Sequence, residues 1–544
     1  MIIAYLRSIL FGLAACLWIS AAKAASYDMV PDSPFKAAKS GNASIWQSAD
    51  SLKFKLPADA SFRPGVPLYV RVRYLDEGCG LIKLYYRSDA EPWPDSENHL
   101  RSSRVNTGQM VESLHELKHP VVEEGSSLVR ILNPQGVPLS LSRITIADEP
   151  FEEPQFKYII REPWKTPLEL PPNGAPKPSL KGTIMVGYQG WFRMPNDLYD
   201  NGARHWFKAP TAEFPINYAT DMWPDMSAYP QSAWMRAGDL LTQSGKPAWL
   251  FSSASPEVVG QHFRWMRESK IDGAFVQRFM SHRAGGNDGT PEWVLYAVRH
   301  AAHAERRLWA IEYDLSGLTN ENALVVLQRD WAWLVDDLKI TRDPYYAHEN
   351  GKPVVFIWGL PVKSRGFKPE VADEVVRFFK SDPVYGKNYL IGGISSQWRN
   401  QPEWLSHLRN YDAVLTWQGR NYEADRGDFQ KMNLKYYPHV WPGFSWSHLK
   451  DVSDQYTPRQ GGNFYWDLLS KALHAGNDWL FVGMFDDEGT AIMPMSDDAP
   501  PPKPGYGRFL TNEGRSPLWW LQLTSYAKET LENKRSKNQP MPGH

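Results

Sequence analysis

Cysteine is nearly absent from this sequence of 544 residues, which contains only Cys16 and Cys79. Cys16 lies in an N-terminal segment that we expect to be removed, and a single remaining cysteine can form neither an internal disulfide nor a thiolate metal cluster. Histidines give no metal signature, because His300 and His303 lie in a predicted helix without a third ligand nearby and no His-Glu-x-x-His motif occurs. The sequence therefore predicts no metal and no other cofactor.

An excess of charge of one sign is also lacking, since 60 Lys and Arg stand against 61 Asp and Glu. This balance argues against nucleic acid or an anionic membrane as the main partner. No Gly-x-Gly-x-x-Gly motif follows a predicted strand, so nucleotide binding has no support. No Gly-x-Ser-x-Gly motif is present, so the sequence does not support a serine hydrolase either.

Aromatic residues, in contrast, are abundant: the chain has 24 Trp, 25 Tyr and 23 Phe. A Trp-rich core accounts for many of them. The excess indicates flat aromatic surfaces for a ligand, because sugars present CH faces that stack on aromatic rings.

The first 24 residues are typical of a secretory signal. Arg7 gives a positive start, the apolar run "ILFGLAACLWISAA" follows, and "AKA" at 22–24 fits a cleavage site. The run is too short for a membrane-spanning helix. "LAAC" at 13–16 also fits a lipoprotein signal with a lipidated Cys16, and we favour cleavage after Ala24. Both alternatives predict export to the periplasm or the extracellular space.

The rest of the chain contains two regions with different patterns of predicted secondary structure. Residues 26–150 contain short alternating strands such as "PLYVRVRYLD", separated by Gly, Pro and Asp turns, which predicts a β-sandwich accessory domain. Residues 151–181 are rich in proline and indicate a linker. From 182 to 530 apolar strands alternate with amphipathic helices, which predicts a (β/α)8 barrel. A flexible tail is expected at 531–544, and we expect a monomer.

The barrel prediction leaves one strand too many. Nine strand candidates compete for eight places, and we expect "DAVLTWQG" at 412–419 to fall outside the closed barrel or to pair at its rim. A doubly wound open sheet is the alternative fold.

Polar and aromatic residues stand at the carboxyl ends of the predicted strands. The active site of a (β/α)8 barrel lies at these ends. A purely structural barrel would not need carboxylates, amides and indoles on one rim. The residues predicted to bind substrate are Trp191, His205, Trp223, Gln277, Arg278, Glu312, Asp314, Trp358, Trp417, Trp446 and Asp487.

Three carboxylates follow the last predicted strand in "DWLFVGMFDDEGTAI", residues 478–492. Glycoside cleavage needs one carboxylic acid that protonates the leaving oxygen and a second carboxylate that acts as nucleophile or base. Because side chains alternate along a strand, Asp486 and Glu488 can share a face while Asp487 points away. We predict Glu488 as the general acid and Asp486 as the base or nucleophile. The structural alternative is that Asp487 or Glu488 caps the next segment or pairs with an arginine.

"AIEYD" at 310–314 offers a second pair of carboxylates, Glu312 and Asp314. They can hold substrate hydroxyls or supply the second catalytic carboxylate, and an ion pair of Glu312 with Arg278 is the structural alternative.

The segment 202–229 after the first strand is too long for an ordinary connection. It contains His205, Asp221 and Trp223, and we interpret it as a binding loop over the barrel mouth. For His205 a hydrogen bond to substrate and a packed structural role are both open.

Seven motifs together resemble bacterial proteins of the glycoside hydrolase family 71/99-like group. They are "MVGYQGWF", "DMWPDMSAY", "LFSS", "HFRWMRESKIDGAFVQRF", "GFSWSHL", "PRQGG" and "MFDDEGTAI". The resemblance covers about residues 181–525 and extends to family 99 endo-α-mannosidases and family 71 α-1,3-glucanases. It implies a (β/α)8 barrel that needs no metal. The predicted sandwich is not covered.

The resemblance also implies two acidic residues spaced i, i+3 on the last strand. Glu488, followed by Gly489 and Thr490, matches the second of them, the general acid. Phe485 stands in the first position, and Asp486 is the nearest substitute. Family 99 retains and family 71 is thought to invert, so the stereochemical outcome stays open.

These observations predict an exported hydrolase that cleaves α-linked polysaccharide or glycan at internal bonds of the chain. One alternative is a barrel that binds glycan without cleaving it. The other is a scaffold of an envelope complex.

Overall fold

A computed structural model describes residues 25–32, 34–40, 43–48, 51–63, 65–75, 79–86, 100–105, 110–117, 120–123, 127–132, 139–151, 179–195, 197, 203–208, 217–281, 290–336, 338–360, 362, 365–450, 456–502 and 509–543. The predicted signal (1–24) and most of the predicted linker lie outside these residues. The chain divides into two compact units, Met1–Arg161 and Glu162–His544, and each is described by itself.

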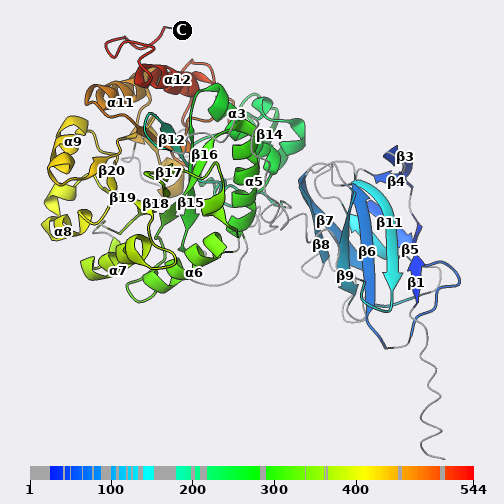
Figure 1. Ribbon diagram of the computed structural model, residues 1–544. Helices are drawn as coiled ribbons and strands as arrows, with labels where there is room; N and C mark the ends of the chain where they lie inside the picture. The colour runs from blue at the N-terminus through cyan, green and yellow to red at the C-terminus, as the bar shows by residue number, and fades with distance from the viewer. Residues whose placement is uncertain are drawn as a thin grey trace, which may run out of the picture. The chain divides into compact units, whose positions relative to one another are not determined.

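The first unit contains two antiparallel sheets (Figure 1). One has the order β3-β4-β11-β6-β9 with β1 beside β11, and the other has the order β2-β5-β10-β7-β8. The strands are β1 (Ser26–Asp28), β2 (Val30–Pro31), β3 (Lys36–Ser40), β4 (Ala43–Ser48), β5 (Ser51–Lys55), β6 (Leu68–Leu75), β7 (Cys79–Tyr86), β8 (Leu100–Val105), β9 (Met110–Leu117), β10 (Ser127–Leu132) and β11 (Leu139–Ala147).

Alternating side chains build the core of this unit. Leu68, Val70 and Val72 of β6 are buried and belong to one hydrophobic cluster with Leu52 and Phe54 of the other sheet. The alternation arises because successive side chains of a strand point to opposite faces. Strands of both sheets therefore contribute to one hydrophobic cluster.

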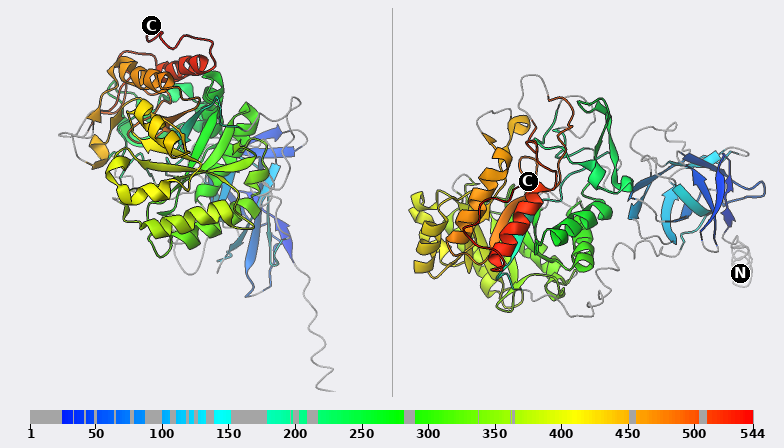
Figure 2. Two further views of the ribbon diagram at one scale, coloured as in Figure 1. Left: turned by 60° about the vertical axis from the view of Figure 1, so that its left-hand side comes forward. Right: turned by 90° about the horizontal axis from the view of Figure 1, so that it is seen from above.

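The second unit is built on a mainly parallel sheet (Figures 1 and 2). Its order is β21-β20-β19-β18-β16-β15-β12-β25-β22. These strands are β12 (Ile184–Tyr188), β15 (Gly273–Phe279), β16 (Leu308–Asp314), β18 (Lys352–Trp358), β19 (Tyr389–Ser395), β20 (Ala413–Trp417), β21 (Lys435–Tyr436), β22 (His439–Val440) and β25 (Leu480–Asp486). Their almost continuous apolar sequences suit strands that are covered on both faces.

Helices alternate with these strands along the chain, as predicted. They are α3 (Pro256–Glu268), α5 (Thr290–Glu305), α6 (Ala323–Asp336), α7 (Pro369–Ser381), α8 (Leu405–Leu408), α9 (Tyr422–Lys431), α10 (Ser447–Lys450), α11 (Asn463–His474) and α12 (Trp519–Leu531). Short 3-10 helices are η1 (Met226–Ala228), η2 (Gln231–Ala233), η3 (Ile340–Arg342), η5 (Trp398–Asn400), η6 (Pro402–Trp404) and η7 (Gln460–Gly462). The remaining strands are β13 (Met235–Leu241), β14 (Pro247–Leu250), β17 (His348–Glu349), β23 (Phe444–Ser445) and β24 (Tyr456–Thr457).

The two ends of the parallel sheet are two halves of one short segment, residues 435–440. The N–H of Tyr437 donates to the carbonyl of Val414 at 2.8 Å, and the N–H of Phe481 donates to the carbonyl of Pro438 at 3.0 Å. The segment therefore reaches β20 with its first half and β25 with its second half, so the sheet curls back on itself. Figure 2 shows the helices around this curled sheet, which is consistent with the predicted (β/α)8 barrel.

One strand prediction is wrong. "DAVLTWQG" contains β20, which pairs in parallel with β19 and β21. The candidate left outside is "PAWLFSS", because its β14 pairs antiparallel with β13. The connection between these two strands turns at Gly245, whose φ of 78° suits glycine. A short apolar run has the same composition in a hairpin and in a parallel sheet, so periodicity alone could not separate the two.

Candidate active site

The predicted site residues gather mainly where the parallel strands end. Gln277 faces Glu312 across β15 and β16, and Asp314 at the end of β16 lies between Phe279 and Trp358 in the register of the sheet. Asp486 ends β25 beside Tyr188, the last residue of β12. Because all these strands are parallel, their carboxyl ends lie at one end of the sheet.

Asp486 is enclosed by the protein. Its side chain has no exposed surface, and its two oxygens accept the backbone N–H groups of Gln189 at 2.8 Å and Gly190 at 3.0 Å. Burial raises the pKa of this carboxyl well above its usual range, against the opposing effect of these two hydrogen bonds. Asp486 therefore fixes the turn that follows β12, a geometry that does not favour the predicted role as nucleophile or base.

The alternation argument for Asp486 and Glu488 does not apply to the structure. Strand β25 ends at Asp486, and its pairing with β12 is irregular between Val186 and Tyr188. Asp487 and Glu488 lie beyond the strand, where neighbouring side chains no longer point to opposite faces of a sheet.

Glu488 lies beside His205 in a nearly dry environment. Its side chain is 7% exposed, and its Oε1 is 2.7 Å from Nδ1 of His205. Burial raises the pKa of Glu488 to about 8, with a further contribution from the charge of Asp221. Burial also lowers the pKa of His205 to about 3. At neutral pH a protonated carboxyl therefore faces a neutral imidazole.

Aromatic rings hold His205 in place. The imidazole stacks on Trp191 with ring centres 4.0 Å apart. Trp191 also stacks on Phe279, with ring centres 4.9 Å apart. His205 has a φ of 64°, a conformation that few residues other than glycine adopt. These contacts join the segment after β12 to the end of β15.

Asp487 is the second carboxylate that reaches the surface of the site. It is 9% exposed, and it accepts hydrogen bonds from Nε2 of Gln189 at 2.8 Å and from the N–H of Gly489 at 2.9 Å. Burial, followed by the charge of Glu488, raises the pKa of Asp487 to about 7. The contact of Gln189 with Asp487 joins residues 298 positions apart, so spacing in the sequence could not reveal it.

Asp221 holds the backbone of Glu488 in place. Its N–H donates to the carbonyl of Glu488 at 2.8 Å, while its carboxylate accepts hydrogen bonds from Ser445, Ser447 and His448. The sequence indicated that Asp221 lies in a binding loop, but its partners could not be found from spacing.

Gly489 permits the approach of the segment 444–447 to this loop. A Cβ atom at this position would lie 2.5 Å from both the carbonyl oxygen of Ser445 and Cδ1 of Trp446. The predicted binding residue Trp446 is half-buried at this contact. The glycine is therefore needed for close packing.

Of the second pair of carboxylates, Asp314 is hydrogen-bonded within the described part of the protein and Glu312 is not. Asp314 accepts hydrogen bonds from Nε2 of Gln277 at 3.0 Å and from the N–H of Ser316 at 2.7 Å. Glu312 is fully buried, and among the described residues its oxygens have no hydrogen-bond partner. Burial and the neighbouring charge of Asp314 raise the pKa of Glu312 well above its usual range.

Two predicted binding residues are buried in contacts with other parts of the protein. Arg278 is bound by both oxygens of Asp330 in α6, at 2.6 Å each, and is 1% exposed. It follows Gln277 directly, so it points to the opposite face of the sheet. Trp223 is 2% exposed and packs against Tyr218 and Phe509. The pattern of polar and aromatic residues did not distinguish these structural positions from binding positions.

Trp358 and Trp417 form the other aromatic wall. Their ring centres are 4.8 Å apart, and Trp417 lies 4.4 Å from the ring of His439. Both tryptophans are half-buried, so each keeps part of its surface available for a ligand. Within the part of the chain that the structure describes, no cluster of three His, Cys, Asp or Glu side chains is arranged for a metal ion.

Comparison with known proteins gives structural neighbours only. No family model and no curated protein matches the chain. The structure is similar to the GH99 endo-alpha-mannosidase from Bacteroides thetaiotaomicron, with 16% identity, a TM-score of 0.49, and coverage of 66% of this chain and 100% of that chain. A glycoside hydrolase-like protein matches with 18% identity, a TM-score of 0.38, and coverage of 60% of this chain and 98% of that chain.

A glycoside hydrolase of family 5 from Bacteroides vulgatus is a further neighbour. It matches with 12% identity, a TM-score of 0.32, and coverage of 55% of this chain and 72% of that chain. Family 99 is one of the families that the sequence motifs resemble.

Proposed function

We propose that this chain is a glycoside hydrolase in which Glu488 is the general acid. The observation that carries the proposal is a buried carboxyl just beyond the carboxyl end of β25, 2.7 Å from His205, whose ring stacks on Trp191. Burial raises the pKa of this carboxyl to about 8. A general acid must hold its proton at the working pH, and a dry environment is the usual means of raising the pKa of a glutamate. Glu488 donates this proton to the leaving oxygen as the glycosidic C–O bond breaks.

Asp487 is the partner that we assign in place of Asp486. It borders the same site, and its pKa of about 7 leaves a substantial ionised fraction at neutral pH. As a carboxylate it removes a proton from the attacking water, or from a substrate hydroxyl that attacks first. Gln189 orients it through the 2.8 Å hydrogen bond to Oδ2. Asp314 is the alternative partner, because it is 5% exposed at the end of β16.

The substrate in this proposal is an α-linked polysaccharide or glycan that is cleaved internally. The half-buried indoles of Trp191, Trp358, Trp417 and Trp446 supply stacking surfaces for sugar rings. Export through residues 1–24 belongs to the proposal and would place the enzyme where such polymers occur. In the described residues, no helix combines the length and apolar character that crossing a membrane requires.

The experiment is a measurement of reducing-end release from α-mannans, α-glucans and mixed bacterial polysaccharides. We expect Asp487→Asn to lower kcat by about 10²–10⁴-fold on the substrate that wild type cleaves, because general base catalysis is lost. Asp314→Asn is the matched variant and should change mainly KM. The reverse ranking would transfer the base role to Asp314.

The same panel tests the alternative functions. If wild type releases no reducing ends but calorimetry detects glycan binding, the chain is a glycan-binding protein and the proposed hydrolysis is wrong. Fast loss of polymer viscosity relative to reducing-end release would identify internal cleavage. If viscosity falls only in proportion to reducing-end release, internal cleavage is contradicted.

A further inference from the structure

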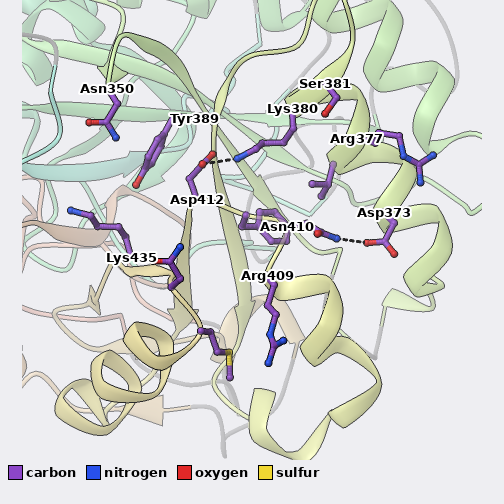
Figure 3. A pocket seen from close by; sticks show the side chains of 14 residues that line it. Asn350, Asp373, Arg377, Lys380, Ser381, Tyr389, Arg409, Asn410, Asp412 and Lys435 are labelled. Atoms are coloured by element: carbon purple, nitrogen blue, oxygen red, sulfur yellow. Dashed lines mark hydrogen bonds and ion pairs between the residues drawn. The ribbon is translucent and has the colours of Figure 1, made fainter.

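A cavity of about 740 Å³ lies at the other end of the parallel sheet, away from Glu488. Figure 3 shows the side chains that line it. They come from α7, from Tyr389 at the start of β19, from the residues just before β20, and from Lys435 at the start of β21. Because these are the amino-terminal ends of the strands, the cavity shares no residue with the candidate active site.

Positive charge dominates the lining. Its cations are Arg377, Lys380, Arg409 and Lys435, and its anions are Asp373 and Asp412. The anions already have partners in the protein: Lys380 forms a 2.5 Å ion pair with Asp412, and Asp373 accepts 2.7 Å hydrogen bonds from Asn410 and His407.

Three of the cations have no such partner. Within the described ranges, no hydrogen bond or ion pair involves the side chains of Arg377, Arg409 or Lys435. Lys435 only lies over the ring of Trp479, at 5.7 Å. An anionic ligand in this cavity would therefore not compete with an internal carboxylate for these three groups.

Neutral polar groups accompany the cations. Tyr389 is 4% exposed, and its hydroxyl is buried without a hydrogen-bond partner among the described residues. Asn350 and Asn433 also line the cavity. Figure 3 shows Asn350, Tyr389 and Lys435 on one side of the Lys380–Asp412 pair, and Arg377 and Arg409 on the other.

We propose that this cavity binds an acidic saccharide, a sugar that carries carboxylate or phosphate groups. Guanidinium and ammonium groups are the usual partners of such oxyanions, and amide and phenol groups pair with sugar hydroxyls. The volume falls within the range of small-molecule sites, about 300–1,000 Å³, and exceeds what a bare oxyanion fills. The positions of the cations on both sides of the central ion pair suit a ligand longer than one anionic group. This site is independent of the proposed hydrolysis.

The test is isothermal calorimetry with the full chain and three probes: trigalacturonate for carboxylate, glucose 6-phosphate for phosphate, and maltotriose as a neutral sugar. Arg409→Gln with Lys435→Gln removes two cations of the cavity. Arg329→Gln with Lys471→Gln removes the same charge from exposed positions on α6 and α11. Arg377→Gln, on the exposed side of α7, gives a second and separate test of the site.

We expect one or both acidic probes to bind wild type, and the preferred one identifies the anionic group. The cavity double variant should weaken that binding by about tenfold or more, as two charge-assisted contacts imply. The surface double variant and Glu488→Gln should bind like wild type. Absence of binding by both acidic probes at about 0.1 M salt, or unchanged binding in both cavity variants, would overturn the proposal. So would binding of maltotriose that equals that of the acidic probes and is weakened equally by the cavity variants.

Discussion

Glu488→Gln is expected to lower kcat/KM by about 10²–10⁴-fold on the substrate that the wild-type protein cleaves. Glutamine has nearly the same shape as glutamic acid and can still hydrogen-bond to His205, but it has no proton to give to a leaving oxygen. KM should change little, because the stacking surfaces at the strand ends stay in place. Glu423→Gln, on the exposed side of α9, is the charge-matched control and should retain full activity.

The pH profile of the wild-type enzyme follows from the same residues. The acid must be protonated and the base ionised, so activity should fall above the pKa of Glu488, about 8, and below the pKa of Asp487, about 7. A bell-shaped profile of kcat/KM with a narrow maximum between these values is expected. The two limbs belong to the coupled pair. A flat profile from about pH 6 to 9, or full activity of Glu488→Gln, would remove Glu488 from the mechanism.

Glu488→Gln should lower activity but raise the stability of the fold at high pH. The pKa of Glu488 is higher in the folded protein, about 8, than its ordinary value of 4.5, so this group stabilises the fold most fully below its ordinary pKa. That contribution is lost as the pH rises through the folded pKa. The variant should therefore unfold at a higher temperature than wild type near pH 9, and at a similar temperature near pH 4. An inactive variant that is also less stable at about pH 9 would indicate structural damage instead.

The fold could be predicted from the sequence wherever the local hydrophobic pattern of a segment identifies it as a strand or a helix. Strands β15 and β16 begin with apolar runs, "GAFV" and "LWAI", and helix α7 has a clear amphipathic pattern. β20 and β14 have similar composition, and only their partners distinguish them. The break at Tyr437 and Pro438, which lets one segment pair with both β20 and β25, has no signal in the local pattern.

The alternation rule accounts for the positions of some of the predicted site residues. Gln277 and Glu312 face each other as the alternation implies, and the rule that strand ends meet at one edge brings Asp314, Asp486 and Trp358 to the same end of the sheet. The alternation rule failed at the point where β25 ends, since Asp486 lies within the strand and Glu488 lies beyond it. The contact of Glu488 with His205, across 283 positions, depends on a loop whose course no spacing rule describes.

Arg278 illustrates the remaining difficulty, because a charged residue at a strand end can face either surface of the sheet. We expect Asp330→Ala to lower the free energy of unfolding of the second unit by about 3–5 kcal/mol, since it removes the two-oxygen ion pair with the buried guanidinium of Arg278. Asp467→Ala, which breaks the exposed pair with Lys471, should cost at most about 1 kcal/mol.

Urea unfolding followed by tryptophan fluorescence measures this difference. The signal reports the second unit, because only Trp18, Trp46 and Trp93 precede residue 162. Arg278→Met combined with Asp330→Leu should recover most of the lost stability, since an apolar pair of similar size needs no charge partner. The double variant should also keep glycan turnover, because Arg278 lies on the α6 side of the sheet. Loss of turnover at full stability would instead return Arg278 to the substrate-binding residues, as the sequence predicted.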